Sequence, residues 1–236
     1  MALPRAFTET RIPRHWVVRG APNTGKSTFL TALRGPVVVI DADHRARELA
    51  GRGPVDIWPF STKPHENTDP YLIAQILMRD AEEYAREVRT IAVDSVSGIL
   101  TPIIARAMAG NKRGENKNKV AAFVEKAQVL RLIQDPLAAT GCDIIYIWHE
   151  ETAFDNNAKR VTHQTVPDTE RKRLQRSLNA LLVADIDAEG RRRLRIGWSR
   201  SGHGQGQAFV DTVGGWVGVP EQIDAALAGA AREEAL

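Results

Sequence analysis

One loop in this chain combines the residue types and spacing that bind phosphate groups. Residues 20–28 read Gly-Ala-Pro-Asn-Thr-Gly-Lys-Ser-Thr and fit the pattern G-x-x-x-x-G-K-[ST]. In this pattern backbone N–H groups and a helix N-terminus surround the phosphates, the lysine reaches the β- and γ-phosphates, and the serine hydroxyl ligates Mg²⁺. The residues that we expect to bind a nucleotide are Gly20, Ala21, Pro22, Asn23, Thr24, Gly25, Lys26, Ser27 and Thr28.

Two flanking segments supply the secondary structure that such a loop needs. Residues 15–19 are typical of a short strand running into the loop, and residues 27–33 are typical of a helix leaving it. A glycine-rich turn that joins strand to helix and binds nothing is the alternative interpretation. Because Lys26 and Ser27 stand where the chemistry requires them, we favour nucleotide binding.

A carboxylate follows a second apolar strand. Asp94 comes directly after Ile-Ala-Val at residues 91–93. This is the Walker B pattern, in which a carboxylate at the carboxyl end of a strand binds Mg²⁺ through its water shell. An aspartate that only caps the next helix is the alternative. Given the nearby phosphate loop, we expect Asp94 and Ser27 to hold the metal ion of Mg-ATP.

Hydrolysis of the nucleotide also needs a group that orients the attacking water and takes its proton. The candidates are Asp41, Asp43 and Glu48. We favour Asp43 because it lies just past a strand end, whereas Asp41 suits a structural role at the strand terminus. His149 ends another apolar strand and could contact the γ-phosphate and report its presence to the following loop. A histidine that only caps a strand or meets solvent is the alternative.

Strand and helix patterns alternate along the chain. Runs of β-branched residues indicate strands buried on both faces, and apolar residues at helical spacing indicate helices between them. This alternation predicts an α/β fold with a mostly parallel central sheet flanked by helices, and residues 180–186 and 192–198 predict a C-terminal antiparallel hairpin. We expect a long loop at residues 152–168 and a helix at 120–139 that Pro136 bends or breaks.

The composition is that of an ordinary globular protein. The chain has 236 residues, of which 43% are hydrophobic and 26% charged, which suits one domain at 14–236 after an N-terminal arm at 1–13. Cys142 is the single cysteine, which excludes an intramolecular disulfide and a cysteine-rich zinc site. No apolar run approaches the about 18 residues of a membrane span, and no secretory signal is present. We therefore expect a cytoplasmic protein without a membrane partner.

The ordered set of motifs resembles the RecA-like core ATPases. Residues 20–27 match their phosphate loop, and residues 91–96, Ile-Ala-Val-Asp-Ser-Val, resemble their Walker B segment. Residues 39–44, Val-Ile-Asp-Ala-Asp-His, resemble the family's Ile-Asp-Ala-Glu-His segment, whose Glu activates water. His149 falls where the family places a sensor residue, usually Gln. Residues 178–181 and the two strands after them also resemble the recombinase core.

The resemblance covers residues 14–200 and implies a single RecA-like P-loop ATPase domain. The small size and the histidine sensor are similar to minimal RecA-like proteins of bacteriophages, which serve in single-strand annealing and recombination. Such an origin would place the protein in the host cytoplasm. Asp43 stands where the family has Glu, and it follows Lys26 at a short spacing. Its side chain is one bond shorter, so weak, DNA-stimulated ATP hydrolysis is expected.

Two loops that the resemblance assigns to single-stranded DNA are basic. They span residues 110–119 and 151–176. Their candidate phosphate contacts are Lys112, Arg113, Lys117, Lys119, Lys159, Arg160, Arg171, Lys172, Arg173 and Arg176. Contacts of this kind give affinity without sequence selectivity and weaken as salt rises. Two solvated surface loops that bind nothing are the alternative.

Arginines also gather near the C-terminal hairpin. Arg191, Arg193 and Arg195 share one face of a strand, which suits a DNA-facing stripe, a charged edge strand or a subunit contact. Arg200 follows that strand, close to where the resemblance places a cation that enters the ATP site of the neighbouring subunit. An ordinary exposed arginine is the alternative. The glycine-rich segment 201–218 fits no motif.

These inferences lead to one hypothesis and two alternatives. The resemblance implies an ATP-dependent single-stranded DNA-binding protein acting in DNA recombination or annealing. It would be a homo-oligomer, a filament or ring with ATP at the subunit interface, and could work with a single-strand binding protein. The first alternative is a RecA-like replication motor or helicase loader. The second is a P-loop small-molecule phosphotransferase or nucleotide switch.

Overall fold

A single β-sheet forms the centre of the molecule. The computed structural model describes residues 12–49, 51–52, 57–59, 69–112, 119–154, 160–164 and 168–229. Its strands are β1 (His15–Gly20), β2 (Val37–Asp41), β3 (Ile57–Pro59), β4 (Thr90–Asp94), β5 (Asp143–Phe154), β6 (Arg160–Gln164), β7 (Ala180–Ile186), β8 (Arg192–Ser199) and β9 (Ala208–Val210). Within these described residues the strand order is β3-β2-β4-β5-β1-β7-β8-β9, and β6 pairs with β5 outside that path.

The sheet is parallel from β3 to β7 and antiparallel beyond it. β1 pairs in parallel with both β5 and β7, and β4 pairs in parallel with both β2 and β5. β8 returns antiparallel to β7, and β9 antiparallel to β8. The predicted α/β fold and its C-terminal hairpin are therefore confirmed. Because the parallel strands share one direction, their carboxyl ends meet at one edge of the sheet.

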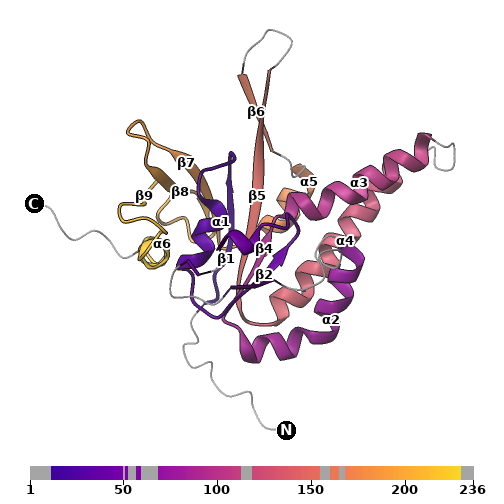
Figure 1. Ribbon diagram of the computed structural model, residues 1–236, viewed down its shortest axis with the longest axis horizontal. Helices are drawn as coiled ribbons and strands as arrows, with labels where there is room; N and C mark the ends of the chain where they lie inside the picture. Colours follow the sequence, from indigo (N-terminus) through magenta and orange to yellow (C-terminus); the bar gives the residue numbers. More distant parts are fainter. Residues whose placement is uncertain are drawn as a thin grey trace, which may run out of the picture.

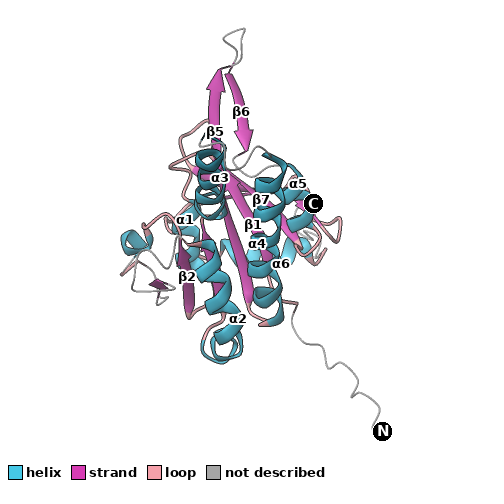
Figure 2. Cartoon of the chain, turned by 90° about the vertical axis from the view of Figure 1, so that its right-hand side faces the viewer, coloured by secondary structure: helices cyan, strands magenta, loops and turns pink. Residues whose placement is uncertain are grey.

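Helices cover both faces of the sheet (Figure 1). They are α1 (Lys26–Phe29), η1 (Leu30–Ala32), η2 (Ala46–Leu49), α2 (Pro70–Glu87), α3 (Val96–Lys112), α4 (Lys119–Ala139), α5 (Asp168–Gln175) and α6 (Val219–Leu227), where η marks a 3₁₀ helix. Figure 2 looks onto the face that α2, α3 and α4 cover, and α1 and α6 lie against the opposite face.

The core has one apolar layer on each face. Successive residues of β1 alternate between them. Val17 packs in the layer covered by α2, α3, α4 and α5, whereas Trp16 and Val18 pack in the layer covered by α1 and α6. All five residues of β2 and all five of β4 are buried, as expected for central parallel strands. These rigid strands place the loops at their carboxyl ends.

One sequence-based expectation was wrong and a second holds only in part. Residues 152–168 do not form one long loop, because β5 continues to Phe154 and pairs antiparallel with β6. This β5–β6 hairpin projects beyond the body of the sheet (Figure 1). The helix expected at 120–139 is present as α4, which does not break at Pro136 and continues to Ala139, while a bend there stays a prediction. Ile133 and Leu137 are buried on either side of Pro136, so core packing holds this last turn in place.

No helix in the described part of the chain is long and apolar enough to cross a membrane. Residues 1–11 of the predicted arm lie outside the described residues. The division into an arm at 1–13 and one domain at 14–236 stays a prediction.

Candidate nucleotide-binding site

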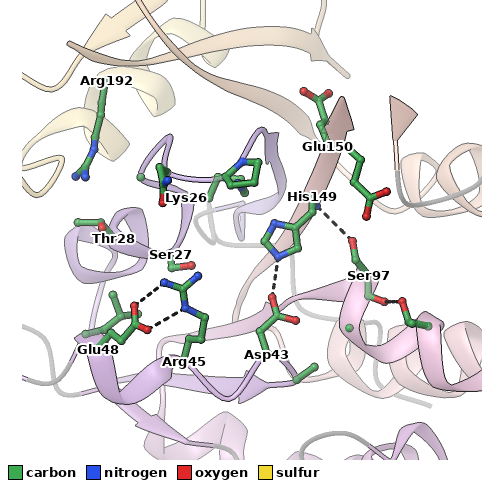
Figure 3. A pocket seen from close by; sticks show the side chains of 18 of the residues that line it. Lys26, Ser27, Thr28, Asp43, Arg45, Glu48, Ser97, His149, Glu150 and Arg192 are labelled. Carbon is green, nitrogen blue, oxygen red and sulfur yellow. Dashed lines mark hydrogen bonds and ion pairs between the residues drawn. The ribbon is translucent and has the colours of Figure 1, made fainter. Parts of the chain in front are cut away.

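A cavity of about 750 Å³ opens beside the loop that follows β1 (Figure 3). Its walls come from the segments that follow β1 and β2, from residues 149–151 within β5, from the start of α3 and from the first residue of β8. Among the predicted site residues it brings together Lys26, Ser27, Thr28, Asp43 and His149. Parallel α/β sheets bind ligands at this edge because the loops there converge from several strands.

The phosphate loop has the backbone shape that its sequence requires. Gly25 has φ 84°, in the left-handed region that favours glycine, and α1 begins at the next residue. Lys26 is buried, and its Nζ donates to the backbone carbonyl of Ala21 at 2.7 Å. Burial lowers the pKa of this ammonium, and the nearby Asp94 carboxylate acts against the lowering. Lys26 is thus held inside the loop, where the phosphate oxygens of a nucleotide could replace the Ala21 carbonyl as its hydrogen-bond acceptor.

Asp94 and Ser27 lie together beside the loop. Asp94 is 4% exposed, and the Ser27 hydroxyl hydrogen-bonds its carboxylate. Its Oδ1 atom is buried without a hydrogen-bond partner among the described residues. Burial raises the pKa of Asp94 to about 6, against the opposing effect of the Ser27 hydrogen bond. A buried carboxylate oxygen without a partner, next to a hydroxyl, fits a hard divalent cation.

Asp43 and His149 form one hydrogen-bonded unit across the cavity. The Nε2 atom of His149 lies 2.7 Å from Oδ2 of Asp43, and the Ser95 hydroxyl donates to Oδ1 of Asp43 at 3.1 Å. The backbone N–H of His149 donates to Ser97 Oγ at 3.3 Å. Burial acts to raise the pKa of Asp43, but the hydrogen bonds and charge of His149 outweigh it and hold this pKa below its usual value.

The three candidate water-orienting carboxylates have different partners. Asp41 accepts hydrogen bonds from the backbone N–H groups of Arg45 and Ala46 at 2.8 and 2.9 Å, so it supports the turn into η2. Glu48 binds the Arg45 guanidinium through both oxygens, at 2.9 and 2.8 Å. Asp43 is the carboxylate that faces Asp94 and His149, since ligand atoms of these three lie within 4.8 Å of one another.

Sequence reasoning missed several residues around the cavity. Arg45 lines the cavity and pairs with the candidate Glu48, and the cavity-lining Glu150 pairs with Arg19 at 3.5 Å. Arg192 of β8 also lines the cavity, although it is far from the loop in sequence. The alternation of side chains along a strand indicates that Arg192 points away from the face shared by Arg193 and Arg195.

Arg200 lies apart from this cavity. Its Nε donates to the backbone carbonyl of Leu178 at 2.8 Å, and its Nη2 donates to the carbonyl of Arg176. It does not line the nucleotide cavity of its own chain. A role in a neighbouring subunit's site stays a prediction.

For six of the predicted DNA-contacting residues the structure describes no side chain. Lys112, Lys119 and Arg160 stand at the ends of α3, α4 and β6, and only their backbone positions are described. Arg113, Lys117 and Lys159 lie outside the described residues.

On α5, Arg171 pairs with Asp168 at 2.7 Å, and Arg173 donates to the carbonyl of Ala127 on α4 at 3.2 Å. Lys172 and Arg176 are exposed, one on α5 and one just after it.

The strand order and the phosphate loop together give the chain a RecA-like P-loop fold. The profile of a protein family described as "AAA domain" matches residues 12–212, and the chain belongs to this family. A similar solved structure is the KaiC-like protein PH0186 from the hyperthermophilic archaeon Pyrococcus horikoshii OT3. The two are 13% identical with a TM-score of 0.50, covering 86% of this chain and 88% of that one, which shows a shared fold. Curated protein sequences yielded no significant match.

Proposed function

We propose that this chain is an ATP-dependent single-stranded DNA-binding protein that acts in recombination or annealing. The observation that supports it best is the path of β5. This strand carries His149 at the nucleotide cavity and continues to Phe154 in the projecting β5–β6 hairpin. A change at His149 is therefore passed along a paired strand to a segment that the resemblance assigns to DNA.

The residues around the cavity suit Mg-ATP. Lys26 supplies a buried ammonium for the phosphates, and Ser27 and Asp94 would hold Mg²⁺. When bound, Mg²⁺ neutralises negative charge on the phosphates. Asp43 stays ionised next to His149 and Ser95, so it can accept a hydrogen bond and a proton from water at the γ-phosphate end.

Arginines between α4 and α5 support binding to a polyanion. A second cavity, of about 400 Å³, is lined by Arg131, Arg173 and Arg176 against one carboxylate, Asp135. Arg131 and Arg176 are exposed. Arg131 lies on α4 and extends the predicted basic segment 151–176 onto that helix. Several cations around one hollow suit backbone phosphates of a nucleic acid, which carry no sequence information.

We also propose that the active form is a filament or ring. Arg200 would then leave the carbonyls of Leu178 and Arg176 and reach the γ-phosphate held by the next subunit. Cations supplied by a neighbouring subunit stabilise charge that builds up during phosphoryl transfer.

The test measures ATP hydrolysis and fluorescence anisotropy of a labelled DNA single strand at 50 and 200 mM salt. We expect DNA binding in the presence of ATP at low salt, a loss of about tenfold or more at high salt if several phosphates are contacted, and DNA-stimulated hydrolysis. Absence of DNA binding with ATP at low salt would contradict the proposal. Hydrolysis coupled to strand unwinding would assign the chain to the replication motors instead.

A further inference from the structure

The first half of β8 turns its even-numbered residues toward the α1 side of the sheet. Leu194 and Ile196 are fully buried in the same apolar layer as Phe29 of α1 and Trp216. Because side chains alternate along a strand, Arg192 projects to this same side. It lines the nucleotide cavity, and its neighbours Arg191 and Arg193 are bound to Asp187 and Asp185 on the hairpin.

A chain of hydrogen bonds fixes the start of β8 against the loop. The Asp211 N–H donates to the Arg192 carbonyl at 2.9 Å, and the Trp216 N–H donates to Oδ1 of Asp211 at 3.1 Å. The indole N–H of Trp216 then donates to the Gly25 carbonyl at 3.0 Å. Trp216 is 0% exposed and meets Phe29 edge-on at 6.1 Å between ring centroids. Segment 201–218 thus acts as a brace between β8 and the phosphate loop.

The Arg192 side chain lies directly against this loop. A Cβ atom added to Gly25 would lie 2.8 Å from Cδ of Arg192, so the stem of the arginine passes over the glycine. Figure 3 shows Arg192 on the side of Thr28, with Lys26 and Ser27 between it and the pair Asp43–His149. If Asp43 and His149 mark the γ-phosphate end, Arg192 marks the opposite end, where the nucleoside extends.

We propose that Arg192 is a nucleoside-binding residue whose guanidinium lies flat against the purine base. This inference rests on the proposed ATP site. A planar guanidinium stacks on aromatic faces, which a lysine ammonium cannot do in the same way. Among the described residues Arg192 forms no ion pair with a carboxylate, and it is exposed where it lines the cavity. Stacking on the face of a base does not distinguish its hydrogen-bond donors and acceptors, so the site accepts adenine and guanine alike.

Calorimetric titration of the whole chain with ATP, GTP and inorganic tripolyphosphate tests the assignment. Arg192→Ala should weaken ATP and GTP binding about tenfold and leave tripolyphosphate binding unchanged. Arg192→Lys keeps the aliphatic stem on Gly25 but lacks the flat head group, so it should bind ATP as weakly as the alanine variant. Arg191→Ala is the matched control and should bind all three ligands as the wild type does.

Three outcomes would overturn the assignment. Equal weakening of ATP and tripolyphosphate by Arg192→Ala would make Arg192 a phosphate ligand. Wild-type ATP affinity in both Arg192 variants would show that it does not touch the nucleotide. A wild-type chain that binds neither ATP nor tripolyphosphate would remove the proposed ATP site itself, a failure distinct from the other two.

Discussion

His149 and Asp43 hold each other at 2.7 Å across the cavity, although 106 positions separate them in the chain. One follows β2 and the other ends the part of β5 that lies in the central sheet. A nucleotide that reaches this pair meets the candidate base and the candidate sensor at the same time. In the proposed function, hydrolysis and the response of the β5–β6 hairpin would therefore share one hydrogen bond.

The loop lysine should decide nucleotide binding. Lys26→Ala removes the buried ammonium that would meet the β- and γ-phosphates, so we expect calorimetry to detect no ATP binding. The ammonium hydrogen-bonds one backbone carbonyl within its own loop, so circular dichroism should stay that of the wild type. If the variant binds ATP with wild-type affinity, the site has been assigned to the wrong residues.

Asp94 should matter for the metal and little for the unliganded fold. Asp94→Asn removes a charge whose burial is costly, as its raised pKa of about 6 indicates. We expect the melting temperature without ligands to stay equal or rise, and the gain in ATP affinity on adding Mg²⁺ to disappear. Asp185→Asn is the control, since this carboxylate binds Arg193 and does not line the cavity. A variant with normal Mg²⁺ dependence would show that Asp94 is not a ligand.

Asp43 should affect catalysis more than binding. Asp43→Asn cannot take a proton from water, so kcat should fall about 100-fold or more while ATP affinity changes little. Asp43→Glu keeps the carboxylate and extends it toward the length found in the resembled family, so it should retain or raise hydrolysis. Steady-state kinetics on both variants decide this. Unchanged kcat in Asp43→Asn would exclude it as the base.

Trp216 should support the phosphate loop through one hydrogen bond and one buried ring. Trp216→Phe removes the donor to Gly25 and leaves an aromatic ring, so urea unfolding should show a loss of about 1 kcal/mol. Trp216→Ala also empties a fully buried position and should cost about 3–5 kcal/mol. Equal losses in the two variants would mean that the indole N–H, and not the ring packing, carries the stabilisation.

Arg200 should act between subunits. Arg200→Ala and Lys26→Ala are each expected to hydrolyse little ATP. In a mixture, some interfaces join an intact phosphate loop to an intact Arg200, so the hydrolysis rate should exceed that of either variant. Arg200→Ala that hydrolyses ATP normally by itself would end this proposal.

Local patterns were enough to predict the centre of the site. The loop at residues 20–28 and the carboxylate that ends β4 follow from spacing alone, and parallel strands bring their carboxyl ends together. Asp43 and His149 were expected near the γ-phosphate, but their direct contact depends on the tertiary arrangement of β2 and β5.

Features that depend on distant packing were missed. The β5–β6 hairpin pairs polar and β-branched segments that were assigned to a loop, although Asp155-Asn156-Asn157 between them are residue types typical of turns. α4 continues past Pro136 because Leu137 is buried in the core. Arg192 reaches the phosphate loop only because Trp216 braces β8 against it, and no local motif encodes that contact.

The coupling of nucleotide to DNA through His149 is tested most directly by one anisotropy titration. A labelled single strand is titrated with wild type and His149→Ala, each without nucleotide and with a non-hydrolysable ATP analogue that calorimetry shows to be bound. The wild type should bind DNA at least about tenfold more tightly with the analogue, a coupling of about 1.4 kcal/mol, and His149→Ala should lose this gain. An equal gain in both proteins, or none in the wild type, would contradict the account.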